Sequence, residues 1–596
     1  MPARIKLNLL PLPRSLECQR GTFMLPLENP WHAIRINPNA ASPPDHPQAY
    51  TLAISPKGIE ISFREAGGLH AALATLRQLL REYGRRLPCL KIRDWPEFAR
   101  RGVMLDVSRG RVPRLATLLD LAGKLADFKI NELQLYTEHT FAYRKYRSIW
   151  QSWGALTAKE IQILDRRCRD LGIDLVPNQN SFGHLRHFLN DPRLKKLGEF
   201  SEPYEADTKD FLRRPTTLAP NHPGTLPFLR GLYTELLPNF SSPYFNVGCD
   251  ETWDLGKGRS QKLCVARGKG RVYMDFLQRI HREVSRRGKT MMFWGDIILK
   301  YPQLIRELPK NIVVLNWGYE ADHPFDTEAA KFAKAGIPFY VCPGTSTWQT
   351  LIGKHDNAMA NLCAAAKAGK KHGALGYLIT DWGDGGHPQP PAVSWPLLAA
   401  GAALAWTAKA PDEKRLLSAL NRDVFADATG AIASAAINLG SAHQKLGVKA
   451  LNETPLGTVI AAHRPQDREL FCRNGLKWFA KIPPIKIRAT LCEIEKQRNR
   501  LRRAKPQTQA GKILAWELGL AARMAAQSCQ FMLWQQAVAA GKTLLAKRLA
   551  QDGIRDLRKL ERDFKKLWPL RNKATPRHST PFLRWRMDDY RRGSIG

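Results

Sequence analysis

The stretch YFNVGCDETWDLG, residues 244–256, runs from a short apolar segment into two adjacent acids, Asp250 and Glu251. An Asp-Glu pair at the end of a strand is most often a solvated surface turn. Glycines and aromatic residues surround this pair, and similar apolar stretches that end in polar residues recur along the chain. What the two acids do therefore depends on the fold in which this stretch takes part.

Apolar, strand-like runs alternate with segments of helical periodicity across the middle of the chain. Eight strand-like runs separated by helical crossovers over about 300 residues predict a (β/α)₈ TIM barrel over residues 98–400. A doubly wound open sheet is the alternative, but no GxGxxG or P-loop motif follows any of the runs, which leaves its nucleotide-binding form without support. The runs lie at 102–108, 130–138, 173–180, 244–251, 290–297, 312–319, 338–345 and 376–383.

Two further regions flank the predicted barrel. Residues 1–97 combine short β-like runs, AYTLAIS and GIEISF, with one helical segment, GGLHAALATLRQLLREYG, and predict a small α/β domain. Residues 401–596 contain long helical stretches with few strand signals and predict a basic helical C-terminal domain. The expected fold class is therefore α/β, with the barrel between these two domains.

Composition restricts the class of protein. The 596 residues are 44% hydrophobic and include 16 Trp, enough to bury several cores. The ten cysteines stand singly, with no CxxC pair and no Cys/His spacing typical of zinc, so we expect no metal, no cofactor and a cytoplasmic location. The first residues show no signal-peptide pattern, and the longest apolar run, 396–406, is about half the length that crosses a bilayer.

The net charge of +38 is unevenly distributed. Residues 451–596 hold 31 Lys and Arg against 12 Asp and Glu, which is half of the excess. Such a surface attracts polyanions, although a solvated basic helical domain is the simpler explanation. Because no helix-turn-helix, zinc-finger or RNA-binding signature is present, no sequence-specific nucleic acid is expected. The sequence does not indicate the oligomeric state.

Polar and aromatic residues gather where the strands end, which is where barrel active sites lie. Three of the strands end in Trp-Gly-Asp or Trp-Gly-Tyr, and several Trp faces around hydrogen-bonding acids are typical of a sugar pocket. In strand order, the residues at these ends are Arg109; Glu138 and His139; Asn180 and His184; Asp250 and Glu251; Trp294 and Asp296; Trp317 and Tyr319; Trp382 and Asp384.

The adjacency of Asp250 and Glu251 suggests separate tasks for the two acids. Most glycosidases place two carboxylates on either side of the scissile bond, but neighbouring residues of a strand point to opposite faces. Glu251 then suits a general acid at the glycosidic oxygen. Asp250 suits a residue that holds a 2-acetamido group acting as the internal nucleophile.

These motifs together resemble glycoside hydrolase family 20, the β-N-acetylhexosaminidases. VGCDE resembles the family's Gly-x-Asp-Glu signature, RGVMLDVSR its first strand, and LGIDLVPNQNSFGH its third strand. MMFWGD, LNWGY and DWGD fall where the family has its pocket tryptophans. The resemblance covers roughly residues 50–400, and VGCDETWDLGKG, LYTEHTFAY and SFGHLRHFL look closest to the hexosaminidase D-like branch.

The resemblance implies an exo-acting, retaining enzyme that removes terminal N-acetylglucosamine or N-acetylgalactosamine from an oligosaccharide or glycoconjugate through an oxazoline intermediate. It assigns acetamide polarisation to Asp250 and acid/base catalysis to Glu251. The substrate-binding residues would be Arg109, Glu138, Asn180, His184, Trp294, Asp296, Trp317, Tyr319, Trp382 and Asp384.

The chain departs from the family pattern on the second and third strands. Glu138-His139 replaces an acidic pair, and Asn178 and Asn180 stand where acids are usual, so we expect His184 to lack its carboxylate partner. The Tyr that clamps the acetamide is not evident, and Tyr319 is its predicted substitute. A non-catalytic glycan-binding protein on a hydrolase barrel, with a basic domain that binds polyanions, is therefore the alternative.

Overall fold

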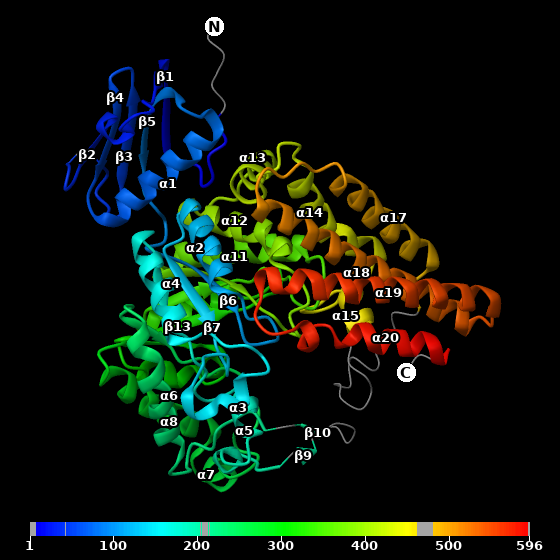
Figure 1. Ribbon diagram of the computed structural model, residues 1–596. Helices are drawn as coiled ribbons and strands as arrows, with labels where there is room; N and C mark the ends of the chain where they lie inside the picture. Colours follow the sequence, from blue (N-terminus) through cyan, green and yellow to red (C-terminus); the bar gives the residue numbers. More distant parts are fainter. Residues whose placement is uncertain are drawn as a thin grey trace.

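The computed structural model describes residues 7–41, 43–202, 215–461 and 481–593, together with the backbone of residues 204–205 and 212–213. Within these residues the chain forms a small α/β unit, an eight-stranded barrel and a helical region, in that order (Figure 1). Residues 462–480, part of the helical region expected from the sequence, lie outside the described residues.

The first unit is a five-stranded mixed sheet that carries one helix. The strand order is β1-β5-β3-β4-β2, and only β2 and β4 pair in parallel. Helix α1 places Ala72, Leu76 and Leu79 at helical spacing against sheet residues such as Leu52 and Ile61, which confirms the expected α/β domain. The elements are β1 (Ser15–Met24), β2 (Ile34–Asn37), β3 (Tyr50–Ser55), β4 (Gly58–Phe63), α1 (Ala66–Tyr83) and β5 (Arg86–Asp94).

Eight parallel strands form the predicted barrel. Their order is β11-β12-β13-β14-β15-β6-β7-β8, and a parallel bridge between Asn178 and Asn246 joins the two ends of the sheet. Each strand lies largely within one of the predicted runs and ends two to five residues before that run does. The strands are β6 (Arg100–Asp106), β7 (Glu132–Tyr136), β8 (Asp174–Val176), β11 (Tyr244–Asn246), β12 (Thr290–Trp294), β13 (Ile312–Trp317), β14 (Phe339–Cys342) and β15 (Gly376–Asp381).

Seven of the eight strands are followed by a helix of at least ten residues. After β12 the described chain has only the four-residue α9 (Asp296–Leu299) and a 3-10 segment (Pro302–Glu307), because Pro302 and Pro309 interrupt the connection. The long helices are α2 (Leu115–Asp127), α4 (Ala158–Asp170), α6 (Thr225–Leu236), α8 (Lys269–Ser285), α10 (Phe325–Ala335), α11 (His355–His372) and α12 (Pro391–Thr407).

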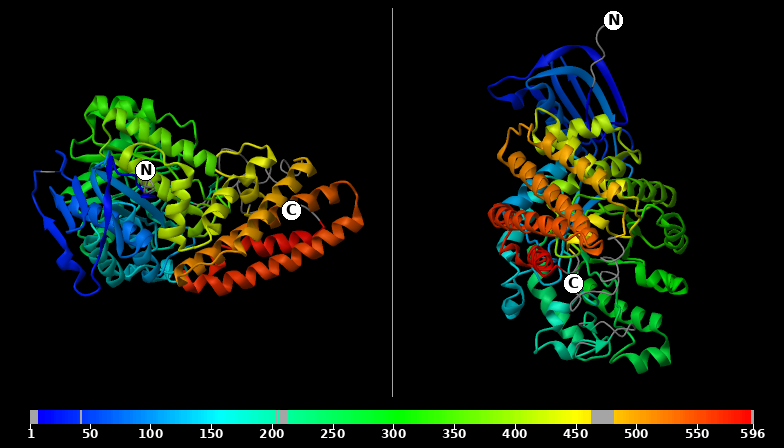
Figure 2. Two further views of the ribbon diagram at one scale, coloured as in Figure 1. Left: turned by 90° about the horizontal axis from the view of Figure 1, so that it is seen from above. Right: turned by 90° about the vertical axis from the view of Figure 1, so that its right-hand side faces the viewer.

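The helices that follow α12 form the C-terminal region. The long, largely apolar stretch of residues 512–550 is broken by Gly541, whose φ of 66° ends α18 and lets α19 return beside it (Figure 2). The helices are α13 (Glu413–Ala419), α14 (Ala431–Ser441), α15 (Pro455–Ala461), α17 (Pro484–Leu501), α18 (Gln509–Ala539), α19 (Thr543–Arg571) and α20 (Pro581–Arg592).

The helical region and the barrel share one hydrophobic core. Leu398 of α12, which crosses the expected boundary at residue 400, belongs to the same buried cluster as Leu518 of α18. The end of α19 also returns to the barrel, where the Arg114 N–H donates to the Arg571 carbonyl at 2.8 Å. Removing the helical region would therefore expose barrel core.

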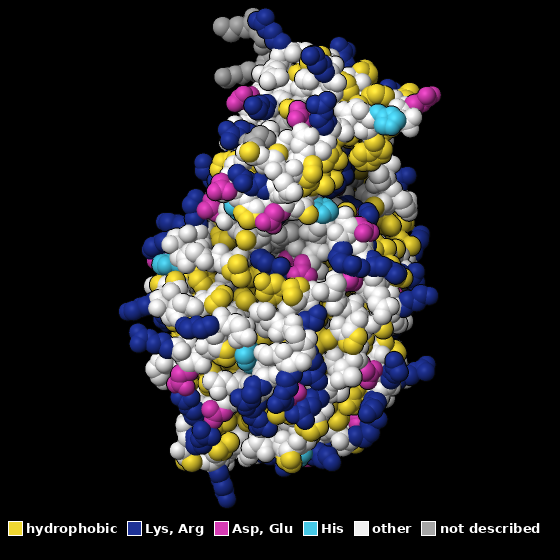
Figure 3. Space-filling view, turned by 90° about the vertical axis from the view of Figure 1, so that its left-hand side faces the viewer, with side chains coloured by type: hydrophobic (Ala, Val, Ile, Leu, Met, Phe, Trp, Pro, Cys, Tyr) yellow, Lys and Arg dark blue, Asp and Glu magenta, His cyan; other side chains and the backbone are white. Residues whose placement is uncertain are grey.

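The surface reflects the basic composition. On the face shown in Figure 3, Lys and Arg side chains are spread over the whole molecule, with few Asp and Glu between them. Among the described residues, no helix has both the length and the apolar character that crossing a bilayer requires.

Candidate active site

The two adjacent acids lie in a left-handed turn beyond the end of β11. The strand ends at Asn246, and φ is positive at Gly248 (67°), Cys249 (70°) and Glu251 (44°). The alternation argument from the sequence is therefore wrong for Asp250 and Glu251, because the strand has already ended. The turn brings both carboxylates to the lining of a single cavity.

Two glycines allow the loop after β8 to press against this turn. A Cβ on Gly248 would lie 2.1 Å from Asn180 Oδ1, and a Cβ on Gly183 would lie 2.3 Å from the Asp250 carbonyl oxygen. Both distances are too short for any side chain. Glycine at these two positions thus fixes the acid-bearing turn against the neighbouring loop.

The cavity at this end of the barrel has a volume of about 510 Å³, within the range of small-ligand sites. Eight of the predicted site residues line it: Asp250, Glu251, Arg109, Asp296, Trp317, Tyr319, Trp382 and Asp384. Further lining comes from Glu320 and from Leu451 and Asn452 of the helical region. The cavity therefore combines residues of the barrel mouth with a loop that follows α14.

Arg109 is held by carboxylates on two sides. One terminal nitrogen, Nη1, lies 3.0 Å from both Asp106 Oδ2 and Asp384 Oδ1, and Nη2 lies 3.5 Å from Glu138 Oε1. Burial alone would lower the pKa of Arg109, but Tyr136 and these carboxylates raise it well above its ordinary value. The guanidinium is thus a fixed, charged hydrogen-bond donor at the cavity wall.

His184 has carboxylate partners, contrary to the expectation from the sequence. Its Nε2 lies 3.2 Å from Asp250 Oδ2 and 3.3 Å from Glu251 Oε2, and its Nδ1 lies 3.9 Å from Glu138 Oε1. Burial lowers the pKa of His184, but Asp250 and Glu251 outweigh it and raise the pKa well above the ordinary value. A cationic imidazole between the two acids offsets their mutual repulsion.

Asp296 is the third acid of the cavity and interacts with the other two. Its Oδ2 accepts a hydrogen bond from the backbone N–H of Glu251 at 3.2 Å. Burial and the neighbouring Asp250 raise the pKa of Asp296 to about 8. At neutral pH this residue therefore holds a proton beside two acids that interact with His184.

Aromatic rings form one wall of the cavity. The rings of Trp317 and Tyr319 stack with their centroids 5.0 Å apart and an interplanar angle of 22°. The Trp382 indole Nε1 donates to the Tyr319 hydroxyl at 2.7 Å, which fixes both rings. Ring faces and edges at a wall of this kind suit the C–H faces of a pyranose.

Four predicted substrate-binding residues lie behind the cavity wall and not on it. Trp294 is fully buried, 5.9 Å from Trp382 between ring centroids, and Asn180 is fully buried against Gly248. Glu138 and His184 contact Arg109 and the two acids from behind. Direct contact of Trp294, Asn180, Glu138 and His184 with a sugar stays a prediction.

The sequence interpretation missed several residues that shape the site. Asp106 accepts hydrogen bonds from Arg109 and, at 2.9 Å, from the Gly383 N–H. It was not predicted as a site residue, although it is the Asp of the first-strand motif RGVMLDVSR. Asn452 had no sequence signal, since it lies about 70 residues beyond the last barrel strand. Its side chain accepts a hydrogen bond from Trp348 Nε1 at 2.9 Å, which holds the loop over the cavity.

Two groups of potential metal ligands occur among the described residues. One consists of His184, Asp250 and Glu251, whose contacts are those of the acid pair. The other consists of Glu138, His139 and His187, behind the cavity wall. The expectation of no metal, drawn from the cysteine pattern, stays a prediction.

Comparison with known proteins gives two matches to family profiles. Residues 98–362 match the profile described as glycosyl hydrolase family 20, catalytic domain, and residues 27–95 match domain 2 of the same family. Together these two matches cover more than half of the chain.

Curated relatives are similar over part of their length. A β-N-acetylhexosaminidase of Cellulomonas fimi is 27% identical over 322 residues, which is 50% of this chain and 59% of the relative. A β-hexosaminidase of Vibrio furnissii is 26% identical over 50% of this chain and 52% of the relative. Hexosaminidase D of Bos taurus is 22% identical over 39% of this chain and 68% of the relative. The chain thus matches little more than half the length of the first two.

Solved structures share the fold at low identity. The exo β-N-acetylglucosaminidase of Vibrio harveyi, solved with N-acetylglucosamine, gives a TM-score of 0.57 at 20% identity and covers 71% of this chain and 77% of its own. The chitobiase of Flavobacterium johnsoniae gives a TM-score of 0.57 at 17% identity and covers 92% of this chain and 96% of its own.

Proposed function

The chain belongs to glycosyl hydrolase family 20, and we propose that it is an exo-acting, retaining β-N-acetylhexosaminidase. Its substrates would be oligosaccharides or glycoconjugates that end in N-acetylglucosamine or N-acetylgalactosamine. The observation that carries the proposal is the shared cavity, which Asp250 and Glu251 line together with aromatic rings while His184 contacts both acids from behind. The named activities of the relatives support it.

In the proposed reaction, Glu251 protonates the glycosidic oxygen and the bond from that oxygen to C1 breaks. The acetamide carbonyl oxygen of the sugar, oriented by Asp250, forms the new bond to C1 from the other face and gives an oxazolinium ion. Glu251, now ionised, then takes a proton from water as that water attacks C1. The acetamide leaves, and two inversions give overall retention.

The remaining lining residues would bind the terminal sugar. Arg109 and Asp384, 3.0 Å apart, offer a paired donor and acceptor to vicinal hydroxyls. Trp317 and Trp382 offer ring surfaces to the pyranose. Exo action is supported by the loop with Leu451 and Asn452, which lines one side of the cavity.

The test is turnover of the nitrophenyl N-acetyl-β-glucosaminide and galactosaminide. We expect wild type to hydrolyse at least one of them, and Glu251→Gln to lower kcat by about 10²- to 10⁴-fold, the usual contribution of a general acid. Glu307→Gln, the same change at an exposed partner of Arg271, is the control and should leave kcat unchanged. Binding of the sugar without hydrolysis by wild type would instead support the glycan-binding alternative.

Two finer assignments are part of the proposal. The closer relation to hexosaminidase D rests on the motifs after the second, third and fourth strands, and a family tree that places the chain elsewhere would remove it. A cytoplasmic location is supported by the nine described cysteines, which are all unpaired. Fractionation that finds the protein outside the cytoplasm would contradict this assignment.

A second candidate function concerns the basic helical region. The groove between α17, α18 and α19, which we call the cationic groove, has a volume of about 630 Å³. Trp516 is 54% exposed in it, and the Lys566 Nζ lies 5.3 Å from the centroid of this ring. A polyanion such as a sulfated glycan fits cations interleaved with an aromatic surface. The cations that line the groove are Arg498, Arg502, Lys512, Arg523 and Lys566.

A further inference from the structure

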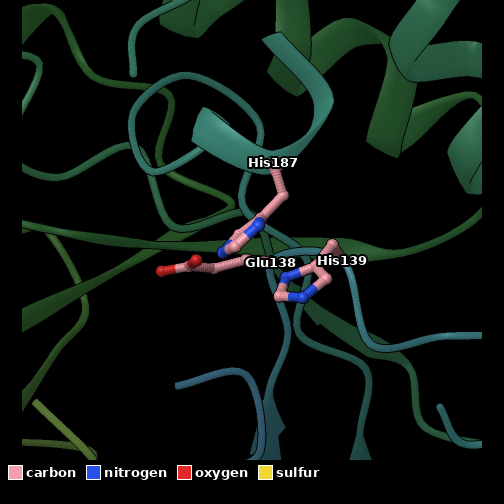
Figure 4. Close-up of side chains that lie close together, drawn as sticks. All are labelled: Glu138, His139 and His187. Carbon is pink, nitrogen blue, oxygen red and sulfur yellow. The ribbon is translucent and has the colours of Figure 1, made fainter. Parts of the chain in front are cut away.

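Behind the cavity wall, one carboxylate and two imidazoles lie together (Figure 4). Glu138 and His139 follow β7, and His187 belongs to the short helix α5 (Arg186–Leu189). One ligand atom from each residue lies within 4.8 Å of the other two. The imidazole rings face each other with centroids 3.7 Å apart and an interplanar angle of 28°.

His139 lacks the hydrogen bonds that a buried histidine normally makes. Its side chain is fully buried, and neither Nδ1 nor Nε2 has a partner among the described residues. A buried polar atom without a partner costs about 1–3 kcal/mol, so such atoms in native proteins usually serve a ligand, an ion or a water. His139 has two such atoms on one ring, and the ring lies beside a second imidazole and a carboxylate. This arrangement indicates a binding partner for the three side chains.

Glu138 can supply an anionic oxygen without giving up its other contacts. The Tyr136 hydroxyl donates to Oε1 at 3.0 Å, and Arg109 Nη2 and His184 Nδ1 lie 3.5 and 3.9 Å from the same oxygen. In the described part of the chain, no hydrogen bond to Oε2 of Glu138 is found, so this oxygen is left for a cation.

We propose that Glu138, His139 and His187 bind a divalent transition-metal ion of the zinc class. Two imidazole nitrogens, one carboxylate oxygen and a water form a common four-coordinate set for such an ion. Ligands at about 2.0–2.2 Å from a metal lie no more than roughly 4.4 Å apart. The observed limit of 4.8 Å exceeds this value, so binding requires the two stacked imidazoles to turn until their nitrogens point at one ion.

His578 lies in the same stack of aromatic rings and offers a control for substitution of His187. His578 stacks on Trp153 with centroids 3.6 Å apart, and Trp153 contacts the rings of both His139 and His187. His578 is not part of the ligand group, and its Nε2 accepts from Arg577 Nε at 3.1 Å. Replacing His578 thus changes the stack without removing a proposed ligand.

The site is connected to the sugar-binding cavity through Glu138. A cation on Oε2 would draw charge from the carboxylate that faces Arg109 and His184. Both cationic side chains would then be held less firmly, and Arg109 lines the cavity. We therefore expect bound metal to raise KM for a nitrophenyl N-acetylhexosaminide severalfold with a smaller change in kcat, an effect that rests on the proposed function.

The binding test needs no substrate and no activity. Tag-free, chelator-treated full-length protein is titrated with Zn²⁺ by equilibrium dialysis and with Co²⁺ by absorption spectroscopy. We expect one tight ion per chain and visible d–d bands of tetrahedral Co²⁺. His187→Phe should weaken binding by at least about 100-fold, because loss of a partner that only supports a ligand already costs 10- to 100-fold. His578→Phe should bind like wild type.

A ligand exchange makes the test independent of folding defects. His187→Cys should restore binding and add a near-ultraviolet thiolate-to-Co²⁺ band, which appears only when the side chain at 187 touches the metal. Equal ion binding by wild type and His187→Phe would overturn the proposal. So would a His187→Cys variant that is folded by circular dichroism and binds Co²⁺ without the thiolate band.

Discussion

The barrel mouth and the cationic groove carry opposite charges within one basic chain. The mouth concentrates acids, with Asp250, Glu251, Asp296 and Asp384 on its lining, and Arg109 contacts Asp384 there. The cationic groove has five cations and the single lining carboxylate of Asp563. The net charge of +38 therefore says little about the chemistry of the individual sites.

The two regions also differ in how their charges are held. At the mouth, Arg109, His184 and the acids are largely shielded from solvent and lie close together, so neighbouring charges shift the pKa of Arg109, His184 and Asp296. In the cationic groove, Arg502, Lys512 and Lys566 are exposed on helix surfaces. Buried, coupled groups suit proton transfer, whereas exposed cations suit reversible binding of an anion.

The largest expected effect is the loss of a buried charge at the mouth. Arg109→Met leaves Asp106, Glu138 and Asp384 without their shared cation, and we expect the free energy of unfolding to fall by about 3–5 kcal/mol. Arg193→Met is the exposed counterpart, since Arg193 pairs with Asp191 at 2.7 Å with its side chain 58% exposed. It should leave the free energy of unfolding close to that of wild type.

Urea denaturation followed by circular dichroism measures both variants. If Arg109→Met and Arg193→Met lowered the free energy of unfolding equally, burial would not distinguish the ion pairs of the mouth from those of the surface.

A smaller, pH-dependent effect is expected at Asp296. Its pKa is about 8 in the folded chain, against roughly 3.9 for an unfolded aspartate. Between these values the unfolded chain has lost this proton and the folded chain has kept it, so Asp296 lowers stability progressively as pH rises from 4 to 8. Asp296→Asn should therefore gain in Tm over wild type across this window, and the gain should level off above pH 8.

Thermal melts at pH 5, 7 and 9 measure this gain. Asp45→Asn, at a side chain that is 98% exposed, should track wild type at every pH. A constant offset between Asp296→Asn and wild type from pH 5 to 9 would show that Asp296 ionises normally.

The smallest effect is expected when cations of the cationic groove are replaced, and it is an effect on binding to heparin. Lys512→Glu with Lys566→Glu should elute from heparin at lower salt, with the salt dependence of binding reduced by about two ion contacts. Lys57→Glu with Lys91→Glu makes the same change in net charge on the exposed N-terminal sheet. Identical elution of the two double variants would show that only the overall charge matters. Deleting residues 451–596 is a poorer test, because α18 shares the core of the barrel.

The sequence predicted the order of the elements well, because hydrophobic periodicity is a local signal. All eight barrel strands lie largely within their predicted runs, and the residues expected at the strand ends do converge on one end of the barrel. Parallel strands that alternate with helices leave few other arrangements.

What the sequence did not predict depends on contacts between distant residues. The left-handed turn at Cys249 and Glu251 is set by Gly248 meeting Asn180, and periodicity cannot reveal such a meeting. His184 follows Asn178 and Asn180, which replace the usual acids, but it pairs with Asp250 from the turn after the next strand. The depth of Trp294 beneath the cavity likewise follows from packing, which a sequence pattern does not specify.

The central claim is that Asp250 and Glu251 catalyse hydrolysis with help from the substrate's own acetamide. The most direct test compares kcat/KM for the nitrophenyl N-acetyl-β-glucosaminide with that for the nitrophenyl β-glucoside, which has a hydroxyl in place of the acetamide. The account predicts turnover of the first and a loss of at least about three orders of magnitude for the second, since the attacking group would be absent. Comparable turnover of the two substrates would contradict it.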